Sequence, residues 1–297
     1  MGKRMKIVPG PASIDLGFKI GQLLGAHVVS IEHKCFPDGE FYIRFTENIS
    51  DEDVVIVQTT GPSQDSNLLQ LLFMLDAAKD LGARSIITVV PYIAYGRQES
   101  RYRPGEAISA NTVFKLIRAI GVDYFITVDF HDPKLLESLE NRFENLSAIP
   151  FLAQFMLKYD LKGAFSLAPD DGAMGFVKTT SKILKGEYGW LEKTRNKVTG
   201  EVIFELKTFD VNGKDVVIFD DIISTGSTMV YAVRALKAQG AKRVYSACVH
   251  PLLINDAKEK ILGAGAIEII GTDSIQSSLK VVSVAPLIAE ALKKWQG

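Results

Sequence analysis

The 297-residue sequence has only two cysteines, Cys35 and Cys248, and a formal net charge of −1. Two cysteines cannot supply a disulfide framework or a four-ligand zinc site, so we expect buried thiols in a reducing cytosol. A charge balance near zero gives no sign of an electrostatic nucleic-acid binder. No apolar run reaches the length that spans a bilayer, and no secretory h-region opens the sequence. These features predict a cytoplasmic protein without a nucleic-acid or membrane partner.

Several well-known catalytic and nucleotide-binding motifs are also missing. The sequence contains neither a Gly-x-x-x-x-Gly-Lys-[Ser/Thr] loop nor a Gly-x-Gly-x-x-Gly fingerprint. A bound nucleotide would therefore be held without a Walker loop or a dinucleotide fold. A serine elbow is absent too, and no Cys/His pair stands out as a nucleophile. What is present is a globular composition, 47% hydrophobic and 23% charged, in a chain long enough for two domains.

Short apolar runs alternate with amphipathic helical segments along the whole chain, which predicts an α/β fold with mostly parallel sheets flanked by helices. The halves echo each other, since Asp53-Val-Val-Ile-Val-Gln resembles Asp215-Val-Val-Ile-Phe-Asp. We therefore expect a duplicated α/β domain, with residues 1–146 as the first copy and 147–297 as the second. The final predicted helix, Pro286 to Lys294, is a candidate to pack back on the first domain.

The most informative stretch runs from Asp215 to Thr228. An apolar run of buried-strand type is predicted to end at a pair of carboxylates, and small hydroxyl residues and a helix follow. This order places a polar loop at the carboxyl edge of a sheet, where α/β folds bind ligands. The small residues suit a phosphate, and the carboxylates suit sugar hydroxyls or a metal. The pattern predicts a ribose-phosphate site, with an ordinary solvated turn as the alternative. The candidates are Asp220, Asp221, Ser224, Thr225, Gly226, Ser227 and Thr228.

Two polar segments in the first half are candidate nucleotide contacts. In an extended chain, Phe36, Asp38 and Glu40 would share one face and could stack a purine and accept its amine. A hairpin with a polar turn is the commoner use of such a stretch. The loop at residues 95–105 carries three arginines, with Arg97 and Gln98 near its start. It suits a polyphosphate and could close over one, with a solvated loop as the alternative.

Other charged side chains are predicted to follow strands or to lie on them. Asp129 and His131 follow the strand predicted at residues 124–128, and Asp170 follows the strand at 165–168. A metal or phosphate role and a purely structural one are both open for this histidine. Lys193 and Arg195 are spaced to share one face of an extended stretch, either as a rigid clamp for phosphoryl oxygens or as a solvated edge strand.

Taken in order, these motifs are similar to those of the ribose-phosphate pyrophosphokinases over essentially the whole chain. The resemblance implies two tandem domains of the type I phosphoribosyltransferase class. It implies transfer of the diphosphoryl group of ATP to the 1-hydroxyl of ribose 5-phosphate, which gives 5-phosphoribosyl 1-diphosphate and AMP for nucleotide biosynthesis. Mg²⁺ is the implied cofactor. A homo-oligomer built from dimers, with the ATP site shared between subunits, is the implied assembly.

The resemblance also implies roles for individual residues. Lys193 and Arg195 would be catalytic, and Arg195 would also bind ribose 5-phosphate together with the residues named above between Asp220 and Thr228. His131 and Asp170, with Asp129 as a further candidate, would be associated with the metal. The implied ATP contacts are Phe36, Asp38, Gly39, Glu40, Arg97 and Gln98.

Some positions depart from the family pattern. Ser224 stands where many members have a third acid, and Ser227 where many have glycine. Asn48 and Ser50 occupy the positions at which the phosphate-activated, ADP-inhibited class carries its allosteric Ser and Arg, so the pattern is more similar to archaeal members. The alternatives are a type I phosphoribosyltransferase, which should lack the second domain copy and the Lys193/Arg195 pair, and a non-catalytic regulatory homologue.

Overall fold

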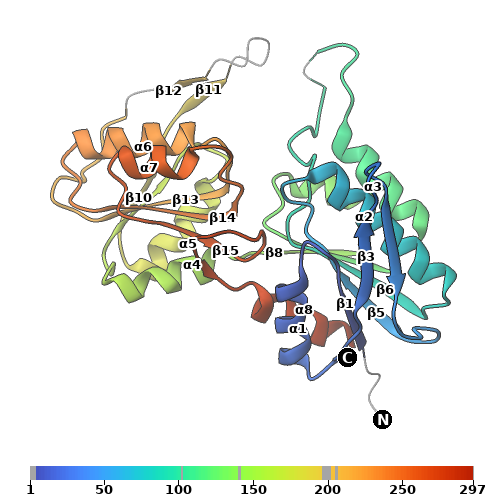
Figure 1. The fold of residues 1–297 in the computed structure, drawn as a ribbon. Coiled ribbons are helices and arrows are strands. Elements are labelled where there is room, and N and C mark those ends of the chain that lie inside the picture. The colour runs from blue at the N-terminus through green and yellow to red at the C-terminus, as the bar shows by residue number, and fades with distance from the viewer. Residues whose placement is uncertain (1–4, 102, 140–141, 196–201, 205–206, 297) are drawn as a thin grey trace. The chain divides into compact units, whose positions relative to one another are not determined.

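The structure is a computed structural model that describes residues 5–101, 103–139, 142–195, 202–204 and 207–296. The chain divides into two compact units (Figure 1). Unit 1 comprises Met1–Leu146, Ser274–Gln276 and Ser283–Gly297, and unit 2 comprises Ser147–Asp273 and Ser277–Val282. Among the described residues, no helix combines the length and the apolar character needed to cross a lipid bilayer.

Unit 1 is built on a parallel six-stranded sheet. Its strands, in spatial order, are β2 (His27–Val28), β1 (Met5–Pro9), β5 (Asp53–Val57), β6 (Ser85–Val90), β7 (Tyr124–Val128) and β8 (Phe143–Leu146). One face is covered by α1 (Ile14–Leu24) and α8 (Ala285–Gln296), which pack against each other, and the other face by α2 (Gln64–Asp80) and α3 (Ser109–Ile120) (Figure 1). The short helix η1 (Pro133–Leu139) precedes β8, and β3 (Ile31–Cys35) and β4 (Phe41–Phe45) form an antiparallel hairpin.

Unit 2 repeats this plan. The spatial order of its parallel sheet is β10 (Tyr188–Trp190), β9 (Phe165–Ala168), β13 (Val216–Ile223), β14 (Val244–Pro251), β15 (Ile269–Thr272) and β16 (Lys280–Val282). The helices α4 (Ile149–Met156) and α5 (Met174–Leu184) cover one face, and α6 (Ser227–Ala238) and α7 (Ala257–Gly263) cover the other (Figure 1). The remaining elements are η2 (Leu157–Tyr159) and an antiparallel ribbon of β11 (Lys193–Arg195) and β12 (Val202–Phe204).

The central strands are continuous apolar runs because both of their faces are covered. Every residue of β5 is buried, and so are all eight residues of β14. Fully burying a Val or Ile side chain stabilises a fold by about 1.5–3 kcal/mol, so these strands dominate the core of each unit. The same burial explains why strand periodicity is absent from the sequence at these positions.

The two units repeat a partly exposed Asp–Arg ion pair, which supports the predicted duplication. In unit 1, Arg84 donates through Nε and Nη2 to the two oxygens of Asp53, at 2.9 and 2.6 Å. In unit 2, Arg243 makes the same two contacts with Asp215, at 2.9 and 2.7 Å. The Arg243 guanidinium lowers the pKa of the Asp215 carboxyl through these hydrogen bonds. Each pair ties the amino end of the third strand of its sheet to the strand beside it.

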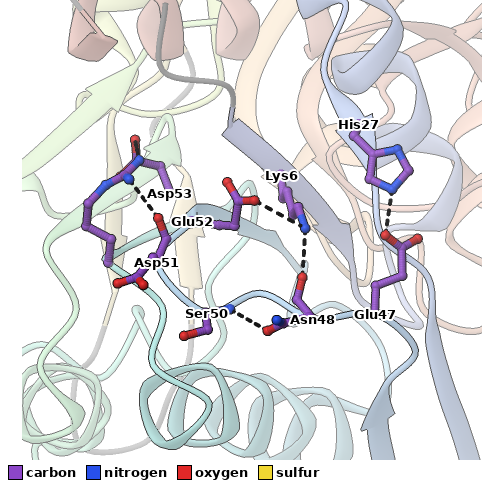
Figure 2. A network of polar contacts seen from close by, with 9 residues as sticks. Lys6, His27, Glu47, Asn48, Ser50, Asp51, Glu52 and Asp53 are labelled. Atoms are coloured by element: carbon purple, nitrogen blue, oxygen red, sulfur yellow. Dashed lines mark hydrogen bonds and ion pairs between the residues drawn. The ribbon is translucent and has the colours of Figure 1, made fainter.

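Figure 2 shows the contacts around the turn that leads into β5. The Lys6 ammonium donates to the Asn48 carbonyl at 2.7 Å and lies 3.5 Å from the Glu52 carboxylate (Figure 2). The Ser50 N–H donates to the Asn48 side chain at 2.9 Å. Asn48, which stands at one of the positions highlighted by the family resemblance, therefore stabilises the local turn, as Asn often does.

One predicted strand end was wrong. The run beginning at Val216 does not end at Phe219, because β13 continues to Ile223 and carries Asp220 and Asp221 within the strand. Residues 36–40 are not extended. They form the hairpin turn that was the commoner alternative for this stretch, since the Phe36 N–H donates to the Glu40 carbonyl at 2.8 Å.

Several elements had no sequence prediction. They include β8, α4, α7 and β16, as well as the short helices η1 and η2. The edge strands β8 and β16 are three or four residues long and carry polar side chains, so neither period is visible. The helix α4 has a proline near its start and is apolar at most positions. Because few polar residues mark an exposed face, the sequence shows no amphipathic pattern there. The predicted domain boundary after residue 146 therefore lies between a strand and the start of a helix.

Candidate active site

Three carboxylates gather at the carboxyl edge of the unit 2 sheet. Asp170 follows β9, and Asp220 and Asp221 lie in the neighbouring strand β13. The partly buried Asp220 loses solvation, and Asp221 and Asp170 add negative charge nearby, so its pKa is raised well above the ordinary value. Repulsion among these carboxylates disfavours their ionised form, and a bound cation or sugar hydroxyls that donate hydrogen bonds would stabilise it.

The hydroxyl loop, residues 224–228, connects this acidic cluster to α6. Gly226 adopts φ 76° at the start of the helix, and a Cβ there would lie 3.0 Å from Ile261. Glycine is therefore required by both the left-handed backbone and the close approach of α7. Thr225 and Ser227 are exposed, and their hydroxyls hydrogen-bond to each other at 3.2 Å. The loop thus presents hydroxyls beside the N-terminus of a twelve-residue helix.

The next loop along the sheet holds the hydroxyl loop in place. The N–H of Leu253 donates to the Ile223 carbonyl, and the N–H of Ile254 donates to the Ser224 carbonyl, each at 3.0 Å. These bonds fix the backbone on which the loop hydroxyls stand. A preformed loop loses less entropy when a ligand binds.

Lys193 and Arg195 lie on β11, which pairs antiparallel with β12. Their backbone is described, whereas their side chains lie outside the described part of the structure, so the predicted clamp stays a prediction. At the base of this ribbon the Lys207 ammonium lies 3.0 Å from Glu192 and 4.4 Å from the centroid of the Trp190 ring. The ion pair and the cation–π contact join the two ends of the ribbon.

In unit 1, the arginine loop, residues 95–105, follows β6 at the carboxyl edge of the sheet. Its stem packs against the segment after β7, because a Cβ at Gly96 would lie 2.4 Å from the Phe130 ring. Arg97 is exposed, and the Gln98 side-chain amide donates to the Ser100 carbonyl at 3.1 Å. Glycine at position 96 therefore allows the two polar segments to meet.

Asp129 and His131 flank Phe130 in the segment after β7. Asp129 is buried with φ 37°, and His131 is exposed. The Phe130 N–H donates to the Asn145 side chain at 2.9 Å, and its ring packs edge-on against Phe114 at 5.5 Å. Spacing alone did not identify Asn145 as a support, because it lies in the unpredicted strand β8.

Phe36, Asp38, Gly39 and Glu40 lie at the tip of the β3–β4 hairpin, and all four are exposed. Gly39 takes φ 96°, and the Glu40 N–H donates to the Asp38 carboxylate at 3.1 Å. The Lys34 ammonium lies 4.8 Å from the centroid of the Phe36 ring. The tip therefore offers an aromatic ring and acceptors to an external partner, in a turn geometry.

The described residues contain no group of three or more His, Cys, Asp or Glu side chains arranged to hold a metal ion. Asp129 and His131 belong to unit 1, and Asp170 belongs to unit 2. The oxygen donors of Asp170 and its neighbours suit Mg²⁺, which is commonly held by one or two carboxylates while substrate phosphates and waters complete the shell. The residues present are thus compatible with a magnesium ion that arrives with a polyphosphate.

Comparisons with known proteins match both units. Residues 5–121 match the family model described as the N-terminal domain of ribose phosphate pyrophosphokinase, and residues 142–270 match the phosphoribosyl transferase domain. The ribose-phosphate pyrophosphokinase of Methanothermobacter thermautotrophicus is 42% identical over 97% of this chain and 99% of its own length. That of Sulfurisphaera tokodaii is 37% identical over 97% of this chain and 100% of its own.

A solved structure agrees with these matches. The phosphoribosylpyrophosphate synthetase from Mycobacterium smegmatis aligns over 99% of both chains with a TM-score of 0.88 and 27% sequence identity. Two phosphoribosyltransferase-type domains in tandem are therefore confirmed, as the family resemblance implied, and so is the duplication that the internal echo in the sequence predicted. The chain belongs to the ribose-phosphate pyrophosphokinase family.

Proposed function

We propose that this protein transfers the diphosphoryl group of ATP to the 1-hydroxyl of ribose 5-phosphate, giving 5-phosphoribosyl 1-diphosphate and AMP for nucleotide biosynthesis. The observation that carries the proposal is the hydroxyl loop at the N-terminus of α6, beside the carboxylates of β13. In this arrangement one end of a ligand meets phosphate-binding groups and the other end meets hydroxyl-binding groups. Membership in the pyrophosphokinase family supports the same reaction.

The sugar phosphate is held by unit 2 in this proposal. The hydroxyls and N–H groups of residues 224–228 bind the 5-phosphate, aided by the α6 dipole. Asp220 and Asp221 accept hydrogen bonds from the ring hydroxyls, since the partly buried carboxylates are charge-assisted acceptors. Binding at both ends fixes the 1-hydroxyl for in-line attack, and such orientation is a large part of catalysis.

The nucleotide is held mainly by residues of unit 1. Phe36, Asp38, Gly39 and Glu40 contact the adenine, and Arg97 and Gln98 contact the phosphates. Asp170 and His131, with Asp129 as a further candidate, are the residues that would hold Mg²⁺, which supplies charge neutralisation of the ATP phosphates when bound.

The chemical step breaks one P–O bond and forms another. The 1-hydroxyl oxygen bonds to the β-phosphorus of ATP, the bond from that phosphorus to the α–β bridging oxygen breaks, and the hydroxyl proton is released. AMP is the leaving group. Lys193 and Arg195 stabilise the negative charge that develops on the phosphoryl oxygens, and Arg195 also contacts the sugar phosphate.

We also propose a homo-oligomer built from dimers, in which the β3–β4 hairpin of one subunit completes the ATP site of its neighbour. The exposed hairpin tip supports this assembly, because its aromatic ring is exposed in the single chain and is therefore available to stack on a base bound to a second subunit. Leu69 and Phe73 on α2 are 48% and 45% exposed in the single chain and offer apolar surface to a second copy.

The test is incubation of the protein with Mg²⁺, ATP and ribose 5-phosphate, followed by product analysis. We expect AMP and 5-phosphoribosyl 1-diphosphate in equal amounts. ADP in place of AMP would contradict diphosphoryl transfer. Absence of turnover would favour the regulatory homologue. In a parallel incubation with 5-phosphoribosyl 1-diphosphate, diphosphate release that requires a nucleobase would favour the phosphoribosyltransferase.

Substitution of the ribbon lysine tests the catalytic role. We expect Lys193→Ala to lower turnover by on the order of a hundredfold, because it removes a donor that acts mainly in the transition state. The Michaelis constants should change far less. Lys178→Ala, at an exposed position of α5, is the matched control and should be neutral. A rise in KM at constant turnover would count against the role.

A further inference from the structure

The β5–α2 loop, residues 58–63, holds the same topological place in unit 1 as the hydroxyl loop in unit 2. Each follows the third strand of its sheet and precedes a helix. The first three side chains of the β5–α2 loop, Gln58, Thr59 and Thr60, are buried. The Gln58 side-chain oxygen accepts from the Ala12 N–H at 3.0 Å, and the Thr59 N–H donates to Ser13 Oγ at 2.8 Å. Neighbouring protein groups therefore take up the hydrogen-bonding capacity that the corresponding loop of unit 2 leaves available to a ligand.

Thr60 makes the contacts that lead to the arginine loop. Its side chain is fully buried, and its hydroxyl accepts from the Ala94 N–H at 2.6 Å and donates to the Tyr92 carbonyl at 3.1 Å. The Thr60 N–H donates to the same carbonyl at 2.8 Å. Three hydrogen bonds from one residue therefore fix the backbone immediately before Tyr95.

Tyr95 is where this backbone changes direction. It adopts φ 66°, which costs a non-glycine residue of the order of 1 kcal/mol. Its hydroxyl donates to Asp65, in the first turn of α2, and this hydrogen bond raises the pKa of Tyr95. A strained residue persists only when its surroundings hold it, and both supports come from the segment after β5.

We propose that Thr60 is a positioning residue for Arg97 and Gln98, with Asp65 as a second support, so that the unit 1 counterpart of the sugar-phosphate loop orients the ATP-binding loop. The inference rests on the proposed contact of Arg97 and Gln98 with ATP. Arg97 follows Ala94 by only three residues, so a shift of the stem moves its guanidinium. Displacement of a binding group by about 1 Å can cost on the order of a hundredfold.

The test compares three variants of two buried threonines in steady-state assays with ATP and ribose 5-phosphate varied separately. Thr60→Val keeps the volume and removes the hydroxyl, so we expect the KM for ATP to rise about tenfold while that for ribose 5-phosphate changes less than twofold. Thr60→Ser should restore most of the ATP affinity. Thr88→Val is the matched control, because the equally buried Thr88 hydroxyl has no hydrogen-bond partner among the described residues.

Thermal unfolding of the same variants separates positioning from stability. If Thr60→Val lowers affinity for both substrates in proportion to its lost stability, or if Thr60→Ser fails to rescue, the proposal is wrong. Asp65→Ala lies at an exposed position and covers the case in which Thr60→Val does not fold. It should raise the ATP KM about threefold, and an unchanged KM would overturn the proposal.

Arg97→Ala distinguishes the two levels of inference. If this variant leaves the ATP KM unchanged, the proposed contact between the arginine loop and ATP fails whatever Thr60 does. If it raises the ATP KM and Thr60→Val behaves like Thr88→Val, the contact stands and the positioning role of Thr60 fails.

Discussion

The loops that follow β5 and β13 occupy the same topological position in the two units, but they differ in the exposure of their polar side chains. After β13, carboxylates and hydroxyls stand at the edge of the sheet, with Thr225 and Ser227 exposed. After β5, Gln58 and Thr60 are fully buried and bonded to neighbouring segments. Under the proposed function, the same loop position therefore serves a ligand in unit 2 and the fold in unit 1. The two uses differ in whether the polar groups of the loop are hydrogen-bonded to neighbouring protein segments or remain exposed to solvent.

Placing a carboxylate in the β5–α2 loop tests the comparison most severely. Gln58→Glu should destabilise the fold by about 4 kcal/mol at pH 7, because deep burial raises a carboxyl pKa by roughly 3 units, each worth about 1.4 kcal/mol. The amide of Gln58 donates to Asn67 and Gln70, and a carboxylate cannot. Chemical denaturation measures the effect, which should grow from pH 5 to pH 8. Gln64→Glu, in the first turn of α2, is the control and should be neutral or stabilising.

A reciprocal exchange at the helix starts sharpens the comparison. Gly226 and Ser63 are the N-cap residues of α6 and α2, and both are left-handed, with φ 76° and 68°. Gly226→Ser should lower activity by on the order of a hundredfold, since its Cβ would press on Ile261 and displace the hydroxyl loop. Ser63→Gly should leave activity unchanged and alter stability by less than about 1 kcal/mol. Equal effects of the two exchanges would show that the loops do not differ in role.

Removing the Asp220 charge gives the smallest expected effect and the opposite sign in stability. Asp220→Asn should lower activity about tenfold, because a charge-assisted acceptor is lost. It should also stabilise the metal-free protein by about 1 kcal/mol at neutral pH. The folded-state pKa of Asp220 is raised, so this group destabilises the fold increasingly as pH rises from its ordinary pKa of about 3.9. The stability gain of the variant should therefore vanish near pH 4. If Asp220→Asn instead lost stability at pH 7, the conclusion that the Asp220 charge destabilises the fold would be wrong.

The sequence predicted the fold where strands are buried on both faces and helices end at glycine. The strand Tyr124–Val128 was predicted to the residue. Short edge strands such as β8 were invisible, since their few residues are half polar. The candidate residues were found as motifs, because chemistry requires particular side chains at strand ends. Thr60 and Asn145 could not be found in this way, since their roles depend on contacts with segments 34 and 15 residues distant.

The repeated Asp–Arg pairs lie at the amino ends of β5 and β13, whereas the candidate ligand-binding residues that belong to the two parallel sheets lie at the carboxyl ends of β6, β7, β9 and β13. Each sheet is thus stabilised by an ion pair at its amino edge, and substitutions at its carboxyl edge leave that ion pair intact. After duplication, the binding residues of each copy can change without loss of strand register, because the ion-pair residues and the candidate binding residues are different residues. This separation is compatible with the proposed divergence of the two halves into a nucleotide-binding unit and a sugar-binding unit.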